Sequence, residues 1–454
     1  MATVVSLEQL ETQVRATLED GRLDELRGLL AEHHPADIAD VIDRLDDDEQ
    51  ARVFGLLPPD QAADVLSETD LDATRALVRK LSPEAAAALF QLMSTDDVVE
   101  ILGEDIPEAQ QALLRAMAPG EARDVRRHLA FPARSAGRLM TEGFVRVAAE
   151  QSAADGLAAL RQAAPEVETL SDLYVLDGGG RLTGVVTLRA LLVAPPEQPL
   201  GAIATEPEAL VTPDTDQEQV ARLVSQYDLL AIPVVTAGGV MLGVVTIDDV
   251  VDVLVQEGSE DVLRLGAVQE GATDESYFTT PIRRTIGRRV GWLMILFLTG
   301  TFTVNVLGWF EGALEQIVAL SFFIPLLIGT GGNTGAQTVS TMVRSLAVGE
   351  IRPRDLWRVV GRELLSGLLL GALLGAAAFG LALLLGNGAD LALVVGLTVV
   401  AICTWANTIG AMVPLLAYRL GLDPALVSAP LITTLVDATG LAIYLLIASS
   451  ILGL

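Results

Sequence analysis

The sequence has few of the residues that build disulfide-stabilised folds and most metal-dependent enzymes. It contains one cysteine, Cys403, and three histidines, of which His33 and His34 are neighbours. A disulfide framework or a thiolate zinc site within one chain needs more than one cysteine, so both are excluded. The sequence also lacks a histidine-rich metal site, a nucleophile elbow and a phosphate-binding loop. We therefore expect a protein that is not an enzyme.

Positive charge is also scarce. The chain has 30 Lys and Arg against 59 Asp and Glu, and residues 1–275 hold 51 of these acidic residues but only 20 of the basic ones. A half this acidic repels nucleic acid and attracts cations, so metal ions are its natural small partners. Solubility or adaptation of the host explains the composition equally well when it is taken alone.

Long apolar stretches are confined to the remainder of the chain, which is nearly neutral. Each reaches the roughly 20 residues that a helix needs to cross the hydrocarbon core of a lipid bilayer. The five expected spans are residues 290–310, 317–343, 364–385, 391–417 and 423–454.

Arginines predict the orientation of these spans, because short cytoplasmic loops collect positive charge. They precede the first span and lie between the second and third and between the fourth and fifth, whereas the opposite loops have none. The N-terminal half is therefore expected in the cytoplasm and the C-terminus outside. The N-terminus lacks a basic region followed by an apolar core, so we expect no cleaved signal peptide.

The second and third spans are rich in glycine. Gly367, Gly371 and Gly375 repeat every four residues in the third span, which favours close helix packing. In the second span, Asn333 and Gln337 occur at membrane depth among several glycines, so this helix is expected to face protein or a water-filled path. The alternative is a packing kink whose polar groups bond to neighbouring helices.

Asp437 lies well inside the fifth span, and the spans contain no base placed to neutralise it. An unpaired carboxylate there costs at least ~2.5–3.5 kcal/mol, so it should face a partner, water or an ion. Thr433 lies one turn earlier on the same helix face. Mg²⁺ keeps most of its water and needs only one or two carboxylates, which two copies of Asp437 on a two-fold axis would supply. The alternative is a protonated carboxyl, or one bonded to the amides of the second span, that only holds the helices together.

The N-terminal half contains two kinds of repeat. In residues 1–130, short amphipathic helices begin near residues 35, 59 and 82, a period typical of a helical solenoid. Further on, LYVLDGGGRLTGVVTLRALL from Leu173 aligns without gaps with the segment AIPVVTAGGVMLGVVTIDDVV that begins at Ala231, with Leu173 on Ile232 and Gly184 on Gly243. Each copy predicts two buried strands joined by a glycine-rich turn and followed by a helix.

These paired units resemble cystathionine-β-synthase (CBS) modules. With the helical N-domain and the motifs GTGGNTGAQ and DPALVSAPLITTLVDATGL, the whole chain resembles the MgtE magnesium transporter family. The resemblance implies a multidomain fold with an all-α superhelical N-domain, an α/β tandem CBS pair, a connecting plug helix and an α-helical five-span transmembrane domain. The expected boundaries are 1–130 for the N-domain, 131–196 and 197–254 for the CBS modules, 255–282 for the plug helix and 283–454 for the transmembrane pore domain.

The resemblance also implies a function. Members of this family are homodimeric, magnesium-selective channels of bacterial inner membranes that close when cytoplasmic Mg²⁺ is high. Their second and fifth spans line the pore, and Asp437 matches the pore carboxylate, with Thr433, Asn333 and Gly332 as further candidates. A transporter of Co²⁺, Ni²⁺ or Mn²⁺ is the alternative. A CBS-regulated anion channel is disfavoured, because its path would need basic groups or helix N-termini.

Acidic residues crowd positions 248–261, where like charges three and four residues apart repel. Divalent ions that bridge this segment to the N-domain and the membrane half would convert repulsion into attraction, provided that they bind the compact state better. Each residue taken singly is also an ordinary surface acid. The resemblance implies these regulatory Mg²⁺ ligands: Asp64, Asp96, Glu100, Glu218, Asp228, Asp249, Asp252, Glu257, Glu260, Asp261 and Asp423.

CBS pairs often bind adenine nucleotides, with an aspartate after the second strand of a module contacting the ribose. The second module has Asp249 at this position, whereas the first has Ala190, preceded by Arg189. The sequence therefore leaves ATP binding open, with Arg189 and Asp249 as the candidate contacts.

Overall fold

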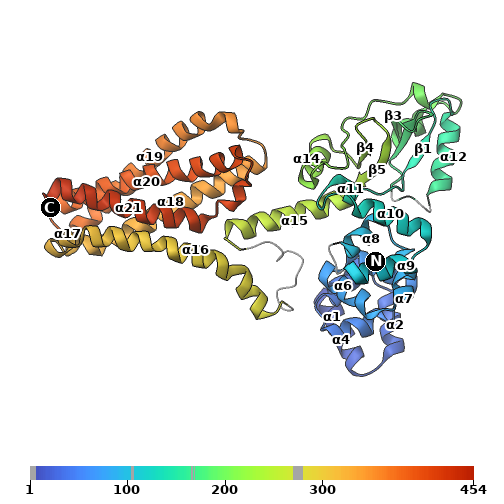
Figure 1. Cartoon of the computed structure of the whole chain (residues 1–454), viewed down its shortest axis with the longest axis horizontal. Helices are drawn as coiled ribbons and strands as arrows, with labels where there is room; N and C mark the ends of the chain where they lie inside the picture. The colour runs from blue at the N-terminus through green and yellow to red at the C-terminus, as the bar shows by residue number, and fades with distance from the viewer. Residues whose placement is uncertain (1–6, 104–106, 165–166, 168, 269–279, 454) are drawn as a thin grey trace. The chain divides into compact units, whose positions relative to one another are not determined.

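The computed structural model describes residues 7–103, 107–164, 167, 169–268 and 280–453. Their contacts divide the chain into two compact units, which Figure 1 shows with the helix and strand labels used below. The described residues up to Glu257 belong to the first unit, and those from Gly258 belong to the second.

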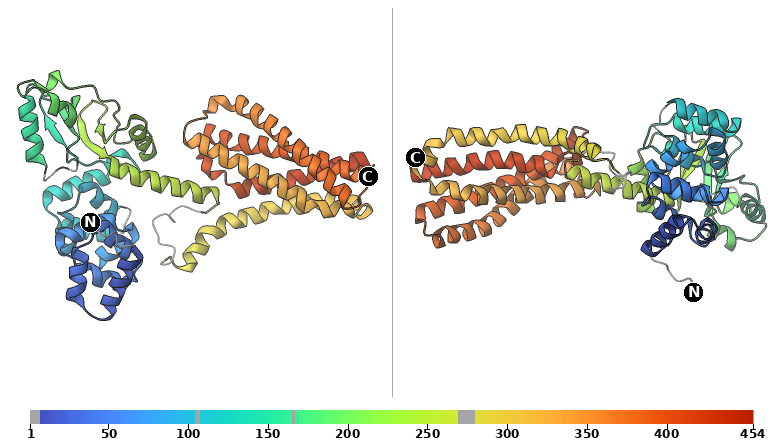
Figure 2. Two further views of the ribbon diagram at one scale, coloured as in Figure 1. Left: turned by 180° about the vertical axis from the view of Figure 1, so that it is seen from behind. Right: turned by 90° about the horizontal axis from the view of Figure 1, so that it is seen from below.

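Short helices form the N-terminal part of the first unit. Helices α3, α5, α7 and α9 pack in succession against one another, and α4, α6, α8 and α10 form a second row. Figure 2 shows this group of short helices in blue to teal. The predicted repeat is confirmed, since α3, α5 and α7 begin at Pro35, Pro59 and Pro83. Proline suits the first turn of a helix, where its missing N–H would have no partner in any case. The bounds are α1 Leu7–Glu19, α2 Leu23–Ala31, α3 Pro35–Ile42, α4 Asp47–Phe54, α5 Pro59–Glu68, α6 Leu71–Lys80, α7 Pro83–Phe90, α8 Thr95–Leu102, α9 Pro107–Ala116 and α10 Pro119–Leu129.

Two α/β modules follow, and the predicted internal duplication is confirmed by their strand register. Val175 pairs with Gly184 in the first antiparallel hairpin and Val234 pairs with Gly243 in the second, each just before a bulge. The all-α and α/β classes expected for the first unit are thus both confirmed. The elements are α11 Ala136–Leu139, β1 Val145–Val147, α12 Ala153–Ala163, β2 Asp172–Leu176, β3 Leu182–Thr187, α13 Leu188–Val193, η1 Leu200–Ala202, α14 Gln217–Tyr227, β4 Ala231–Val235 and β5 Met241–Thr246.

Each module contributes a backbone segment that crosses the hairpin of the other module at its matching glycine. Thr141, near the start of the first module, exchanges backbone hydrogen bonds with Val244 of the second, and Thr205, near the start of the second, does the same with Val185 of the first. A Cβ on Gly243 would lie 2.5 Å from the Thr141 carbonyl oxygen. Glycine is therefore required where the exchanged segment crosses the hairpin, and the modules form one paired body.

Helix α15 (Ile247–Leu265) begins directly after the second module. It is continuous across residue 254, where the connecting helix was expected to begin, so the module's last helix and the connecting segment are one element. The part of the expected plug helix over residues 269–279 lies outside the described residues.

Long helices form the second unit and match the five expected spans. Helices α16, α19, α20 and α21 are long and apolar enough to cross a membrane, and α18 equals α19 in length but carries more polar residues. Helices α16 and α19 begin about two turns earlier than expected, because arginine favours helix although hydropathy excludes it from the membrane core. The elements are α16 Ile282–Trp309, α17 Glu311–Gln316, α18 Ala319–Ala347, η2 Pro353–Asp355, α19 Leu356–Leu384, α20 Ala389–Arg419, η3 Pro424–Leu426 and α21 Ala429–Leu452.

The glycine repeat of α19 forms the contact with α20, as predicted. A Cβ on Gly371 would lie 2.8 Å from the Val400 Cα atom, and one on Gly375 would lie 2.6 Å from the Gly396 carbonyl oxygen. The two backbones approach each other along this row because no side chain separates them.

Asp43 is a partly buried carboxylate between the helical repeats. The backbone N–H of Asp70 donates to both of its oxygens at 3.2 Å. Burial, together with the charges of Asp70 and Asp40, nevertheless raises the pKa of Asp43 to about 7. Because this folded-state pKa exceeds its ordinary value of 3.8, ionisation costs the folded state free energy.

We expect the free energy of unfolding of the N-domain to fall as the pH rises from about 4 to 7, the range between the unfolded and folded pKa values of Asp43. Asp43→Asn keeps an oxygen to accept the Asp70 N–H but cannot ionise, so at pH 8 it should stabilise α3 to α6 by on the order of 2 kcal/mol. Native-state hydrogen exchange of the full chain at pH 5 and pH 8 measures this difference.

The matched control is Glu32→Gln, which removes an exposed acid from the same domain. It should change the exchange rates equally at both pH values. A stabilisation by Asp43→Asn that is the same at pH 5 and pH 8 would contradict an ionisation cost at Asp43.

Candidate functional site

Helix α18 packs against α20 and α21 through three glycines. A Cβ on Gly331 would lie 2.5 Å from Ile402 Cγ2, and one on Gly335 would lie 3.0 Å from Ile432 Cγ2. A Cβ on Gly332 would lie 2.8 Å from Thr433 Cγ2 and 3.6 Å from the Oδ1 atom of Asp437. Three of the four expected pore residues, Gly332, Thr433 and Asp437, are therefore together at the contact of α18 with α21.

Asp437 is partly exposed, but its Oδ1 atom is buried and has no hydrogen-bond partner among the described residues. The neighbouring Thr433 hydroxyl donates to the Ala429 carbonyl at 3.0 Å, which leaves its oxygen free to accept. A buried carboxylate oxygen without a donor carries the full cost of its lost hydration. The contact thus presents oxygen acceptors and no donor to Asp437.

The fourth expected pore residue, Asn333, lies on a different face of α18. Asn333, Gln337 and Ser340 are exposed within the second unit and recur at helical spacing, whereas Gly332 is buried. A polar stripe on a long helix among apolar ones is costly against hydrocarbon. This face therefore needs water or another protein surface.

A row of polar groups anchors the far side of α18. The Thr338 hydroxyl lies 3.0 Å from Asn407 Oδ1 on α20, and Asn407 Nδ2 lies 3.4 Å from both the carbonyl and the Oε2 atom of Glu363 on α19. The sequence reasoning missed Glu363, because it fell one residue before the expected third span. The early start of α19 at Leu356 places it inside the helix.

Arg264 joins two of the predicted regulatory acids within the second unit. Its Nη1 atom lies 2.5 Å from Asp423 Oδ2, and its Nη2 atom lies 2.9 Å from Glu260 Oε2. The side chain of Glu260 is only 1% exposed and that of Arg264 is 14% exposed, so the two ion pairs of Arg264 are largely buried. Arg264 was not among the expected site residues, because a base does not ligate a cation.

A second group of acids lies within the first unit, where α5 and α8 face the beginning of α15. Burial raises the pKa of Glu68, and the charge of Asp252 raises it further. Burial likewise raises the pKa of Asp252, with additional contributions from Asp248 and Asp97. Of these four residues only Asp252 was among the expected ligands, although Asp248 belongs to the acidic segment that ions were expected to bridge. Glu68 and Asp97 were missed, although each lies within one helical turn of a predicted ligand, Asp64 or Asp96.

The remaining expected ligands differ in their surroundings. Asp96 is buried, whereas Asp64, Glu100 and Asp228 are exposed, and Asp261 is partly exposed. Glu218 pairs with Arg222, and Glu257 accepts a hydrogen bond from Gln217 at 2.7 Å. No group of three or more His, Cys, Asp or Glu residues that could hold a metal ion occurs in the described part of the chain.

The two candidate nucleotide contacts sit on equivalent turns of the CBS modules. The Thr246 hydroxyl donates to Asp249 Oδ2 at 2.6 Å. In the first module the Thr187 hydroxyl instead accepts the Ala190 N–H at 3.1 Å, and Arg189 is exposed. The second module thus offers a carboxylate at the position where the first offers a methyl group.

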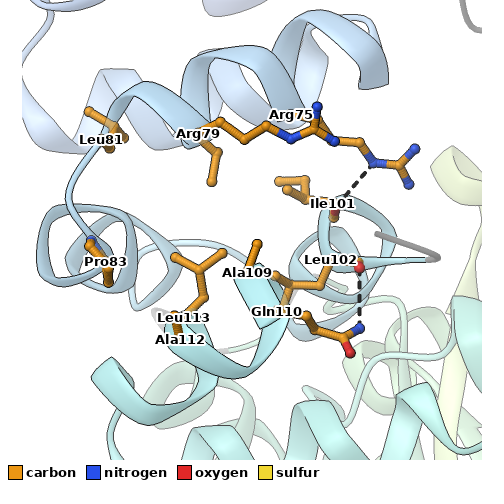
Figure 3. A pocket seen from close by; sticks show the side chains of 11 residues that line it. Arg75, Arg79, Leu81, Pro83, Ile101, Leu102, Ala109, Gln110, Ala112 and Leu113 are labelled. Carbon is orange, nitrogen blue, oxygen red and sulfur yellow. Dashed lines mark hydrogen bonds between the residues drawn. The ribbon is translucent and has the colours of Figure 1, made fainter. Parts of the chain in front are cut away.

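The N-domain contains a pocket of about 170 Å³, lined mainly by residues of α6, α8 and α9 (Figure 3). Its lining contains Arg75, Arg79 and Gln110 but no carboxylate. Arg75 donates to the Ile101 and Glu100 carbonyls, and Gln110 donates to the Leu102 carbonyl. These groups satisfy the C-terminal carbonyls of α8, so the pocket belongs to the packing of the repeats rather than to a cation site.

Comparison with known protein families divides the chain in the same order as the fold. A model described as a divalent cation transporter matches residues 324–447, and one described as the MgtE intracellular N domain matches residues 33–134. The CBS domain model matches residues 136–197 and 200–256.

Among solved structures, the soluble part of a magnesium transporter is 28% identical, with a TM-score of 0.51, and covers 56% of this chain and 99% of that chain. The cytosolic domain of the Mg²⁺ channel MgtE in complex with ATP is 34% identical, with a TM-score of 0.51, and covers 54% of this chain and 99% of that chain. Each of these two structural similarities covers about half of the chain.

Curated relatives match over nearly the whole length. The magnesium transporter MgtE of Thermus thermophilus is 40% identical over 450 residues, which cover 98% of this chain and 99% of the relative. The protein of the same name from Bacillus subtilis is 30% identical, and the alignment covers 99% of both chains. Since this likeness extends through the soluble and the membrane parts alike, the chain belongs to the MgtE family of magnesium transporters.

Proposed function

We propose that this chain forms a Mg²⁺ channel in which Asp437 binds the passing ion. The observation that carries the proposal is the buried Oδ1 atom of Asp437, which has no hydrogen-bond partner among the described residues. A hydrated cation would supply both the compensating charge and, through its water molecules, the missing donors. The MgtE family and its named relatives support Mg²⁺ as the transported ion.

The small number of carboxylates favours a hydrated ion. Mg²⁺ dehydrates reluctantly and is commonly held by one or two carboxylates with several retained waters. Asp437 and the acceptor oxygen of Thr433 fit this pattern, because each can accept hydrogen bonds from metal-bound water. Co²⁺, Ni²⁺ and Mn²⁺ are the alternative cargo. An anion is disfavoured by a carboxylate that has no base beside it.

The proposed pore lies between two copies of the chain. The exposed polar stripe of α18, which includes Asn333 and Gln337, supports this arrangement, because hydrocarbon would not solvate it. A second copy related by a two-fold axis would cover the stripe and bring a second Asp437 to the path. In this arrangement Asn333 lines the pore from the side of α18 that faces the second copy.

We place the N-terminus in the cytoplasm and the C-terminus outside the bacterial inner membrane. Arginines at the start of α16, between α18 and α19 and at the end of α20 support this orientation under the positive-inside rule. With this orientation, the strongly acidic first unit is exposed to cytoplasmic Mg²⁺.

The same unit is proposed to close the channel when cytoplasmic Mg²⁺ is high. The charges of Asp97 and Asp248 raise the cost of ionising both Glu68 and Asp252, so a divalent ion bound among these carboxylates relieves repulsion between α5, α8 and α15. An ion that binds better to the compact arrangement shifts the population towards it. Single carboxylates completed by water suffice for such ions.

Arg264 extends this proposal to the membrane half. It holds Glu260 and Asp423 together through charge-assisted hydrogen bonds, which is the effect expected of a bridging cation. We infer that it keeps the end of α15 attached near the start of α21 at low Mg²⁺, while the acids of the first unit respond to the ion.

ATP is a further proposed ligand, supported by a solved relative named as a complex with ATP. Asp249 of the second module is the candidate ribose contact, and Arg189 is the candidate phosphate contact. Ala190 cannot provide the matching carboxylate in the first module, so the proposed affinity is weaker than for a pair with two aspartates.

We expect Asp437→Asn to abolish Mg²⁺ uptake while the protein still folds and inserts. The amide has nearly the same volume as the carboxylate but lacks the charge that attracts the cation. Uptake into proteoliposomes, followed with a Mg²⁺-sensitive dye, measures the effect. Asp390→Asn at the exposed start of α20 is the matched control and should retain uptake. Uptake by Asp437→Asn at the wild-type rate would contradict the proposal that Asp437 binds the passing ion.

Gly332→Ala should reduce both the thermal stability of the second unit and Mg²⁺ flux. The added Cβ would lie 2.8 Å from Thr433 Cγ2, so α18 and α21 must separate. Overpacking of this kind costs roughly 1–3 kcal/mol. Gly329→Ala one turn earlier has no atom within 4 Å of its new Cβ and serves as the control. Equal flux and melting temperature for both variants would show that the close contact is not needed.

The double variant Glu68→Gln/Asp252→Asn should need at least about fivefold more cytoplasmic Mg²⁺ for half-maximal closure, because coupling of about 1–3 kcal/mol corresponds to such shifts. Currents from reconstituted full-length protein at varied Mg²⁺ provide the measurement. Glu84→Gln/Glu121→Gln removes the same charge from exposed positions of the N-domain and should leave closure unchanged. An identical Mg²⁺ response in both double variants would exclude the acid group as the sensor.

A further inference from the structure

Three exposed arginines form a row at the start of α19. Arg358 and Arg362 lie one turn apart on one face of α19, and Arg354 lies four residues before Arg358 in the 3-10 turn η2 that leads into this helix. The opposite face of α19 carries Gly367, Gly371 and Gly375, which pack against α20. The arginine row therefore points away from the helix bundle of the second unit.

The same face becomes apolar further along the helix. Leu365, Leu369 and Leu373 continue the row at three- and four-residue spacing and are 56%, 59% and 72% exposed. Leucines this exposed on a membrane helix lie in hydrocarbon. The change from arginine to leucine within one turn marks the edge of the hydrocarbon, and it places the arginines at the depth of the lipid headgroups.

The acidic residues near this row make contacts outside it, although the charge of Glu363 also interacts with its neighbour Arg362. Asp355 accepts the Arg352 N–H at 3.0 Å, Glu350 lies 3.4 Å from Arg344, and Glu363 lies 3.4 Å from Asn407. No salt bridge within 4.0 Å joins Arg354, Arg358 or Arg362 to a carboxylate among the described residues. Like charges at this spacing repel one another, so an anion bound along the row would stabilise the start of the helix.

We propose that Arg354, Arg358 and Arg362 bind the phosphate headgroup of an anionic phospholipid. Guanidinium groups recognise phosphate oxygens through paired hydrogen bonds, and arginine clusters beside a membrane helix attract anionic lipid. The site is independent of the ion path, because it lies on the face of α19 opposite the contact with α20. The proposal is that the start of α19 binds one class of lipid specifically, in addition to its general contact with the bilayer.

The acidic first unit is the rival occupant of this row. A lipid is favoured, because the row is continuous with the lipid-facing leucines and lies at headgroup depth. Pairing with the first unit would instead leave the row unavailable to lipid in the intact chain. Free phosphate shares the headgroup chemistry but has no acyl chain to place beside Leu365 and Leu369.

Trp357 provides a local probe of the proposed site. It is 79% exposed and adjoins Arg358, and the chain has only four tryptophans. In the full chain with Trp292, Trp309 and Trp405 replaced by Phe, quenching of Trp357 by phospholipids brominated on their acyl chains reports the lipid beside it. Brominated phosphatidylglycerol should bind there at least about fivefold more strongly than brominated phosphatidylcholine, the contribution expected of a single interfacial arginine.

The triple variant Arg354→Gln/Arg358→Gln/Arg362→Gln should reduce this preference to about one. Arg115→Gln/Arg123→Gln/Arg161→Gln removes the same charge from exposed positions of the first unit and should leave the preference intact. Native mass spectrometry of both triple variants with all four tryptophans present should show phosphatidylglycerol loss only for the α19 variant.

Three results would overturn the proposal. The first is equal quenching by the two lipids in the parent protein, as expected if the first unit covers the row. The second is a preference that survives removal of the three arginines. The third is loss of the preference on addition of inorganic phosphate at tens of millimolar, while sulfate at the same ionic strength has no effect, which would identify a free-phosphate site instead.

Discussion

The close approach of α18 to α20 and α21 is the constraint on which the candidate ion path depends. Gly331, Gly332 and Gly335 each stand where a Cβ would meet a neighbouring side chain at 3.0 Å or less. The absence of three side chains brings the polar helix α18 beside Asp437 and buries one carboxylate oxygen. Any residue other than glycine at these positions would separate the helices and admit water or lipid between them.

The same contact divides α18 into two chemically different faces. One face is buried against α20 and α21 and includes Gly332 and Val339, while Asn333 and Gln337 are exposed on the other. Thr338, Asn407 and Glu363 hold the helix from the buried side. A helix that is well anchored on one face and polar on the other is suited to border a water-filled path.

The two units differ in how their acidic residues are compensated. In the first unit, burial and neighbouring carboxylates raise the pKa values of Glu68 on α5 and Asp252 on α15, so their compact arrangement costs free energy that a cation would offset. In the second unit, Arg264 already neutralises Glu260 and Asp423. The ion sensitivity of the two places should therefore differ, because an arginine already pairs with both carboxylates of the second place.

Local patterns in the sequence determined much of the fold. The repeat beginning near residues 35, 59 and 82, the duplicated hairpins with Gly184 and Gly243, and the glycine row of α19 are confirmed, because each depends on spacing within one or two elements. Asp437 was identified for the same reason, since a charge inside an apolar run is costly wherever the helix packs. Glu363 and the early starts of α16 and α19 were missed, because hydropathy marks the edge of the hydrocarbon rather than the end of a helix.

Only the tertiary structure decided which of these residues meet. Arg264 and Asp423 are far apart in sequence, and so are Glu68 and Asp252, so no local spacing could pair them. The sequence also could not show that Gly332 and Asn333 lie on different faces of α18, where Gly332 is buried against Thr433 and Asn333 is exposed. By itself the sequence determined the elements and the presence of an expensive intramembrane charge, because those follow from chain-local chemistry. The partners of that charge follow from helix packing, which depends on side chains distant along the chain.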